Sequence, residues 1–247
     1  MAAITTLFIP GVGVVQQSHT LTGDIRVHRK FHSKILNNDR DVIVYLPPGY
    51  EDGQKKRYPV LYLNDGQNLF DGATSFILGQ EWRVDETAQS LIAAGPIEPL
   101  IIVGINNTGK DRINEYTPME DTKFKQGGKA DLYGRLIVEE LKPFIDANYM
   151  TRRDARHTGL GGSSLGGLVS LYQVRIWMDM GTKEGSTPEQ DHQNLNDARL
   201  LQEALVKKGW KPGKDLKYFE AKGAEHNEKA WSARVESILK FLFPRKM

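Results

Sequence analysis

Residues 162–166, Gly-Ser-Ser-Leu-Gly, fit the pattern G-x-S-x-G centred on Ser164. A serine in this pattern lies on a tight strand-to-helix turn, where side chains at the two glycine positions would clash with nearby backbone. The N-terminus of the following helix directs N–H groups toward a developing oxyanion. The motif lies between an apolar strand and the segment "LVSLY". It predicts that Ser164 is a nucleophile; the alternative is a glycine-rich turn that only packs a helix on a sheet.

A serine hydroxyl needs a base to take its proton, usually a histidine that a carboxylate orients, and in this fold the order is Ser, acid, His. Two histidines follow Ser164. His192 lies in a polar stretch that begins a helix, whereas His226 lies in the loop between the last predicted strand and the last helix. We predict that His226 is the base. No two histidines have metal-site spacing, and we expect neither metal nor cofactor.

The acid is expected just after the end of a strand between Ser164 and His226. Glu184, in "MDMGTKEG", directly follows an apolar run and is our preferred candidate. Asp191 and Asp179 remain alternatives, Asp179 also as a buried structural carboxylate.

Two backbone amides are expected to hold the oxyanion. Leu165 follows the nucleophile and provides one of them. The stretch "LYLNDGQNLFD" follows an earlier strand and places Gly66 and Gln67 where a tight turn exposes N–H groups. The alternative at this position is a plain β-turn made by residues 64–66.

The remaining pattern predicts the elements that hold these residues. Alternating residues at 24–46 predict an antiparallel β-meander, and continuous apolar runs at 58–65 and 98–106 predict strands covered on both faces. Helical spacing follows at 82–95, 131–148, 197–209 and 228–243, with short strands between. We predict an α/β fold in one domain over 1–247, with the meander at 1–46 and a catalytic core at 58–247.

Composition excludes several classes of function. The 33 basic and 31 acidic residues leave a net charge of +2, which gives no electrostatic footprint for nucleic acid. The chain has no cysteine, so thiolate catalysis and disulfides are excluded. The apolar stretch at 2–15 contains Pro10, Gly11 and Gly13, follows no basic residue, and is too short to span a bilayer. We expect a cytoplasmic protein, although a leaderless secreted or periplasmic form would look the same.

The chain resembles the Putative esterase family of α/β-hydrolases, which includes enterochelin esterases, feruloyl esterases and esterase D-type enzymes. The matching stretches are "RDVIVYLPPGY", "YPVLYLNDGQNLFD", "INEYTP", "GLGGSSLGGLVSLY", "DMGTKEG" and "EHNEKAW", in the order of the family. The resemblance implies an α/β-hydrolase fold, with a mostly parallel sheet and helices on both faces. It implies a serine hydrolase of small-molecule esters that needs no metal.

By position, the resemblance marks Ser164 as nucleophile, Glu184 as acid and His226 as base. It marks Gln67 and Leu165 as oxyanion donors. The residues that it implies line or support the substrate pocket are Asn106, Arg112, Glu115 and Tyr116.

One departure from the family lies at residues 172–174. Ser164 and Glu184 are only 20 positions apart, whereas a parallel crossover normally needs a dozen or more residues and a helix between its strands. Three explanations compete: an internal deletion, a segment that the sequence omits, or a smaller sheet in which the strand at 175–181 moves next to the strand before Ser164. We favour the first two over the third.

The expected function is a carboxylic-ester hydrolase that works through an acyl-enzyme. The alternatives are a degenerate, non-catalytic ligand-binding member of the fold and an acyltransferase that uses the same intermediate. The pattern does not specify the ester or the oligomeric state.

Overall fold

A computed structural model describes residues 18–51, 55–170, 176–207, 210–214 and 216–243. The apolar stretch at 2–15 and the junction at 172–174 lie outside the described residues.

Strands and helices alternate along the chain after an N-terminal β-hairpin, as the sequence predicts for an α/β fold. The elements, in order, are β1 (Asp24–Ser33), β2 (Asn38–Leu46), β3 (Val60–Asn64), η1 (Gly66–Asn68), α1 (Val84–Ala94), β4 (Ile101–Ile105), α2 (Arg112–Tyr116), β5 (Glu120–Asp121), β6 (Gln126–Gly127), α3 (Ala130–Arg135), η2 (Leu136–Leu141), α4 (Lys142–Asn148), η3 (Ala155–His157), β7 (Thr158–Gly161), α5 (Leu165–Val169), β8 (Ile176–Lys183), α6 (Pro188–Lys207), β9 (Leu216–Glu225) and α7 (Glu228–Leu242).

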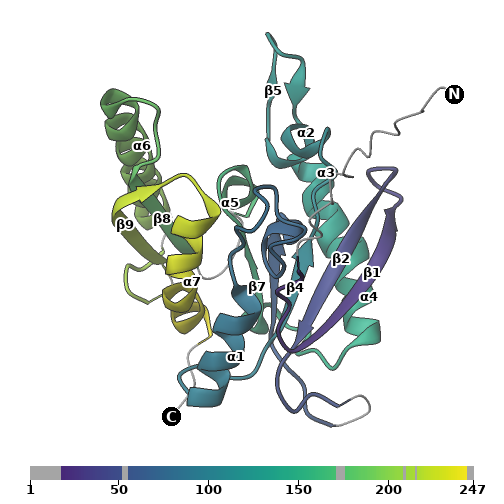
Figure 1. The fold of residues 1–247 in the computed structure, drawn as a ribbon. Helices are drawn as coiled ribbons and strands as arrows, with labels where there is room; N and C mark the ends of the chain where they lie inside the picture. Colours follow the sequence, from purple (N-terminus) through teal and green to yellow (C-terminus); the bar gives the residue numbers. More distant parts are fainter. Residues whose placement is uncertain (1–17, 52–54, 171–175, 208–209, 215, 244–247) are drawn as a thin grey trace, which may run out of the picture.

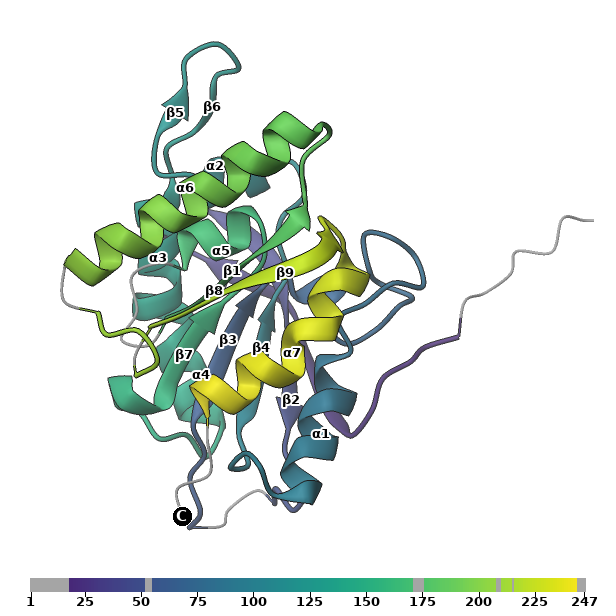
Figure 2. The same ribbon diagram turned by 90° about the vertical axis from the view of Figure 1, so that its left-hand side faces the viewer.

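The larger sheet has five strands in the order β1-β2-β4-β3-β7 (Figure 1; β3 is labelled in Figure 2). β1 and β2 are antiparallel to each other, and β2 is antiparallel to β4. β3 is parallel to both β4 and β7. Every residue of β3 and β4 is buried, which explains their continuous apolar runs. The sheet is mixed because the N-terminal hairpin adds antiparallel strands to a parallel core; the division into meander and catalytic core stays a prediction.

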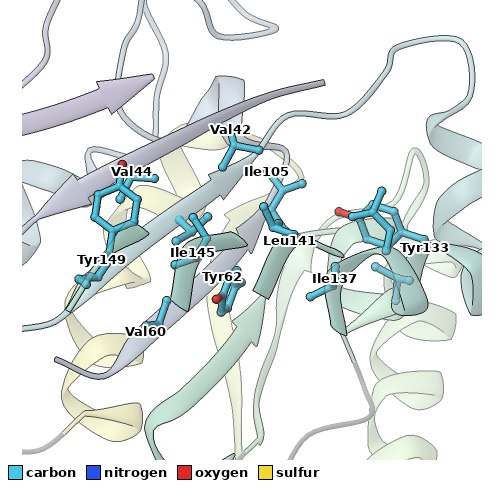
Figure 3. Packing of buried hydrophobic residues seen from close by; sticks show 14 of the residues in the cluster. Val42, Val44, Val60, Tyr62, Ile105, Tyr133, Ile137, Leu141, Ile145 and Tyr149 are labelled. Atoms are coloured by element: carbon cyan, nitrogen blue, oxygen red, sulfur yellow. The ribbon is translucent and has the colours of Figure 1, made fainter. Parts of the chain in front are cut away.

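Helices cover both faces of this sheet. On one face, α3, η2 and α4 pack Tyr133, Ile137, Leu141 and Ile145 against the strands (Figure 3). On the other face, α1 and α7 pack against Leu61 and Ile102. No helix in the described part of the chain is both long and apolar enough to cross a membrane.

β8 and β9 form a separate, parallel two-stranded sheet (Figure 2). Within the described ranges, β7 pairs only with β3 and β8 only with β9. The arrangement in which the strand at 175–181 moves next to β7 is therefore wrong. Instead, Ile176 packs in a small cluster of its own with Leu205 of α6 and Leu216 of β9. β8 is thus held by its ladder with β9 and by packing against α6, and not by pairing with β7.

A buried carboxylate fastens the start of the described chain to α1. Asp85 is fully buried, and its Oδ2 accepts a hydrogen bond from the Thr22 backbone N–H at 2.7 Å. Burial raises the pKa of Asp85 to about 8, and the Glu86 carboxyl adds to the rise. Because the folded state holds this proton more tightly than the unfolded chain, its stabilisation is complete below about pH 4 and is lost as pH rises to about 8.

We expect Asp85→Asn to become progressively more stable than the native protein as pH rises. Asparagine keeps an acceptor for Thr22 and needs no proton to stay neutral. The gap in unfolding free energy should widen by up to about 1.4 kcal/mol per pH unit between about pH 5 and pH 8. Urea unfolding at several pH values measures it. The exposed Asp24→Asn should show no such widening, and a constant gap for Asp85→Asn would contradict the assignment.

Candidate active site

Ser164 occupies a strained turn between β7 and α5. Its φ of 52° and ψ of −130° lie in a region that non-glycine residues seldom adopt. The flanking glycines make the turn possible, because a Cβ at Gly162 would lie 2.8 Å from the Gly166 carbonyl carbon and 2.9 Å from its oxygen. The strand–turn–helix context predicted for the motif is therefore present.

Asn64, at the end of β3, stabilises the turn and the start of α5 through side-chain hydrogen bonds. Its Nδ2 donates to the Gly166 carbonyl at 2.8 Å and to the Ser170 hydroxyl at 3.0 Å, and its Oδ1 accepts from the Tyr133 hydroxyl at 2.7 Å. All these contacts are buried. This role of Asn64 could not be predicted from the sequence, because an Asn-Asp-Gly stretch after a strand is equally typical of a plain β-turn.

Glu184 and His226 form a hydrogen-bonded pair. His226 Nδ1 lies 2.9 Å from Glu184 Oε2, and the Gly181 backbone N–H donates to Glu184 Oε1 at 2.6 Å. The Glu184 side chain is 8% exposed and the His226 side chain 46% exposed. The imidazole also lies edge-on to the Trp231 ring, with centroids 5.0 Å apart. With Nδ1 held by the carboxylate, Nε2 is the nitrogen left to exchange a proton.

A cavity of about 400 Å³ joins the two halves of the site. Ser164, Glu184 and His226 all line it. Among the described residues no hydrogen bond joins Ser164 to His226; such contacts are often long until substrate binds. Most of the wall is apolar, with residues such as Leu160, Leu168, Ile176, Met178, Leu201 and Trp231.

The two predicted oxyanion donors follow neighbouring parallel strands. Leu165 is the first residue of α5 and Gln67 lies in η1, so neither amide has a partner from a preceding helical turn. The turn before Gln67 is fixed by Asp65, which has φ 58° and ψ 46°. Arg112 Nε and Nη2 donate to the two Asp65 oxygens at 2.8 and 2.7 Å, and the Asn107 amide donates at 2.7 Å.

The four residues predicted to line or support the pocket lie outside the lining of the cavity. Asn106 borders Gly66, since a Cβ there would lie 2.7 Å from Asn106 Oδ1. Arg112 pairs with Asp65, whose hydrogen bond raises the pKa of the guanidinium. Glu115 and Tyr116 are buried, Glu115 in an ion pair with Arg40 at 3.0 Å. Contact of these four residues with substrate stays a prediction; their positions suit support of the turn.

The alternative acids lie apart from the imidazole. Asp191 accepts from the Gly185 backbone N–H at 2.6 Å, and His192 is exposed on α6. Asp179 accepts from Trp177 Nε1 at 2.6 Å and pairs with Arg234 at 2.9 Å. Burial raises the pKa of Asp179, and Arg234 partly offsets the rise. In the described part of the chain, Glu184 is the carboxylate that contacts His226.

Among the described residues, no cluster of three or more His, Asp or Glu side chains could hold a metal ion.

Comparison with known proteins identifies the family. The family model described as Putative esterase matches residues 33–174, more than half of the chain. The chain belongs to the Putative esterase family. A curated relative, the endo-1,4-beta-xylanase/feruloyl esterase of Xylanibacter ruminicola, is 29% identical over 86% of this chain and 30% of its own length. The uncharacterized protein YjcH of Bacillus subtilis is 35% identical over 62% of this chain and 56% of its own length.

The chain thus spans less than two thirds of the length of each of these two curated relatives. Among solved structures, the IroE-like serine hydrolase of Shewanella oneidensis superposes with a TM-score of 0.67 at 21% identity, over 89% of this chain and 80% of that one. This likeness agrees with the predicted α/β-hydrolase fold.

We expect Gly162→Ala to destabilise the turn that holds Ser164. The added methyl would lie within 3.0 Å of backbone atoms of Gly166, which would have to shift, at a cost of about 1–3 kcal/mol in unfolding free energy. Gly134→Ala in α3 is the matched control, because its Cβ would enter open space and should stabilise the helix by about 0.5–1 kcal/mol. Urea unfolding compares the two; equal stabilities would contradict this account of the turn.

Proposed function

We propose that the protein is a carboxylic-ester hydrolase that works through an acyl-enzyme on Ser164, with His226 as base and Glu184 as acid. The observation that carries the proposal is one cavity with a strained serine on one wall and the His226–Glu184 pair, at 2.9 Å, on another. Membership of the esterase family and the feruloyl esterase name of one relative support the same class of reaction.

The proposed reaction has two steps. Ser164 Oγ attacks the ester carbonyl carbon while its proton passes to His226 Nε2, and the same proton is then donated to the leaving alkoxide. Water, deprotonated by His226, next attacks the acyl carbon; the bond from that carbon to Ser164 Oγ breaks, His226 returns the proton to Oγ, and the acid is released. Glu184 holds Nδ1–H throughout and stabilises the imidazolium.

The backbone amides of Leu165 and Gln67 are proposed to bind the oxyanion. Amides fixed before the reaction stabilise developing charge without reorganising, and this is commonly the largest contribution to catalysis. Asp65, held by Arg112 and Asn107, would keep the Gln67 turn in place.

The apolar cavity is proposed to take the acyl group of the substrate. The volume of the cavity, about 400 Å³, is in the range of small-molecule sites. Ser164, the residue that would carry the acyl group, is part of its lining. Ala198 of α6 contributes to its wall and is buried, so the size of the cavity can be changed from one position.

Labelling with a fluorophosphonate probe and peptide mapping tests the nucleophile. We expect the native protein to carry the label on Ser164. Ser164→Ala should lose it and lower kcat/KM for p-nitrophenyl acetate by about 10³-fold or more. The neighbouring Ser163→Ala should retain labelling and turnover. A native protein that neither labels nor turns over ester would favour the non-catalytic binding member of the fold, and faster transfer to an added alcohol than to water would favour the acyltransferase.

We expect Ala198→Leu to discriminate against bulky acyl groups. The larger side chain would fill the cavity and lower kcat/KM for p-nitrophenyl hexanoate about tenfold or more relative to the acetate. Ala204→Leu, on the exposed side of the same helix, is the matched control. If Ala198→Leu affects both esters equally, the acyl group binds elsewhere.

A further inference from the structure

Arg234 of α7 is a buried cation placed between two buried carboxylates. Its Nε lies 2.9 Å from Asp179 Oδ1 and its Nη2 lies 3.7 Å from Glu184 Oε1. Its Nη1 donates to the Ala230 carbonyl of the same helix at 2.9 Å. The three side chains are only 6%, 12% and 8% exposed, so water contributes little to their stabilisation.

The Glu184 carboxylate has a different partner on each oxygen. Oε2 faces His226, while Oε1 faces the Gly181 amide and the Arg234 guanidinium. Two carboxylates buried side by side repel each other unless a cation compensates their charges. Arg234 is the cation in contact with both of them in the described part of the chain.

We infer that Arg234 is a positioning residue for the proposed reaction: by contacting both Asp179 and Glu184 Oε1, it holds the Glu184 carboxylate turned so that Oε2 meets His226 Nδ1. Arg234 does so from α7, which otherwise packs on α1 through Val235 and Leu239. Asp179 pairs with the guanidinium at Nε, and Asp179 in turn accepts a hydrogen bond from Trp177 Nε1 at 2.6 Å. This inference rests on the proposed roles of Glu184 and His226.

Removal of Arg234 or Asp179 should act on His226 with opposite signs. Without the Arg234 cation, the surroundings of the imidazole become more negative and its protonated form is favoured. Without the Asp179 carboxylate, the Arg234 charge is less compensated and the protonated form is disfavoured. Other charged groups stay unchanged in both variants. Glu184 and Asp197 line the cavity, and Lys183, Glu225 and Glu228 lie within two residues of Glu184 or His226 in the sequence.

The test measures the titration of His226 by NMR in the Ser164→Ala background, with His226→Gln used to assign its resonance. We expect Arg234→Met to raise the midpoint by about 0.5–1 pH unit and Asp179→Asn to lower it by a similar amount. Lys240→Met is the matched control on α7, because Lys240 pairs with Glu236 of its own helix. It should leave the midpoint unchanged. This readout needs no turnover, so it separates failure of the inference from failure of the proposed hydrolase activity.

Kinetics provide the second readout, with Ser164 present. Arg234→Met should lower kcat for p-nitrophenyl acetate about tenfold or more, with KM changed much less, because a misplaced base slows chemistry rather than binding. A wild-type kcat in folded Arg234→Met overturns the inference. So does a His226 midpoint that stays fixed or moves in the opposite direction in either folded variant. If Arg234→Met fails to fold, the midpoint of Asp179→Asn decides alone.

Discussion

The backbone at Ser164 is held at φ 52° and ψ −130°, and a residue with a side chain keeps such a conformation only when its surroundings fix it. Two glycines leave the space for the turn, and Asn64 ties Gly166 to the end of β3. The Tyr133 hydroxyl ties Asn64 to α3, and the guanidinium of Arg40 lies 5.4 Å from the centre of the Tyr133 ring. The strained conformation of the serine is thus maintained by buried polar contacts that connect β3, α3 and β2.

Much of this architecture could be predicted from the sequence because it depends on local patterns. Continuous apolar runs identified β3 and β4, and the spacing of glycines around Ser164 identified the turn. The contact of Glu184 with His226 agrees with their predicted pairing, because the ends of strands and the loops that follow them can be located from apolar periodicity. Their catalytic roles stay predictions.

Contacts between distant parts of the chain could not be predicted in this way. Asn64 and Arg234 have no sequence pattern that marks them, since a polar residue after a strand or on an amphipathic helix is ordinarily solvated. Their roles depend on which elements become neighbours. The short chain between Ser164 and Glu184 indicated an unusual connection, but not which strands would pair. The separate β8–β9 sheet depends on the packing of side chains with α6 and α7.

The division into two sheets has a consequence for the behaviour of the protein on heating. The serine and the amides proposed to bind the oxyanion follow strands of the five-stranded sheet, whereas Glu184 and His226 follow β8 and β9. No ladder of backbone hydrogen bonds joins the two sheets within the described ranges, whereas α7 contacts β8, β9 and α1 through side chains. Heating should therefore first loosen side-chain contacts such as those of α7 with α1, at temperatures where the five-stranded sheet is still intact.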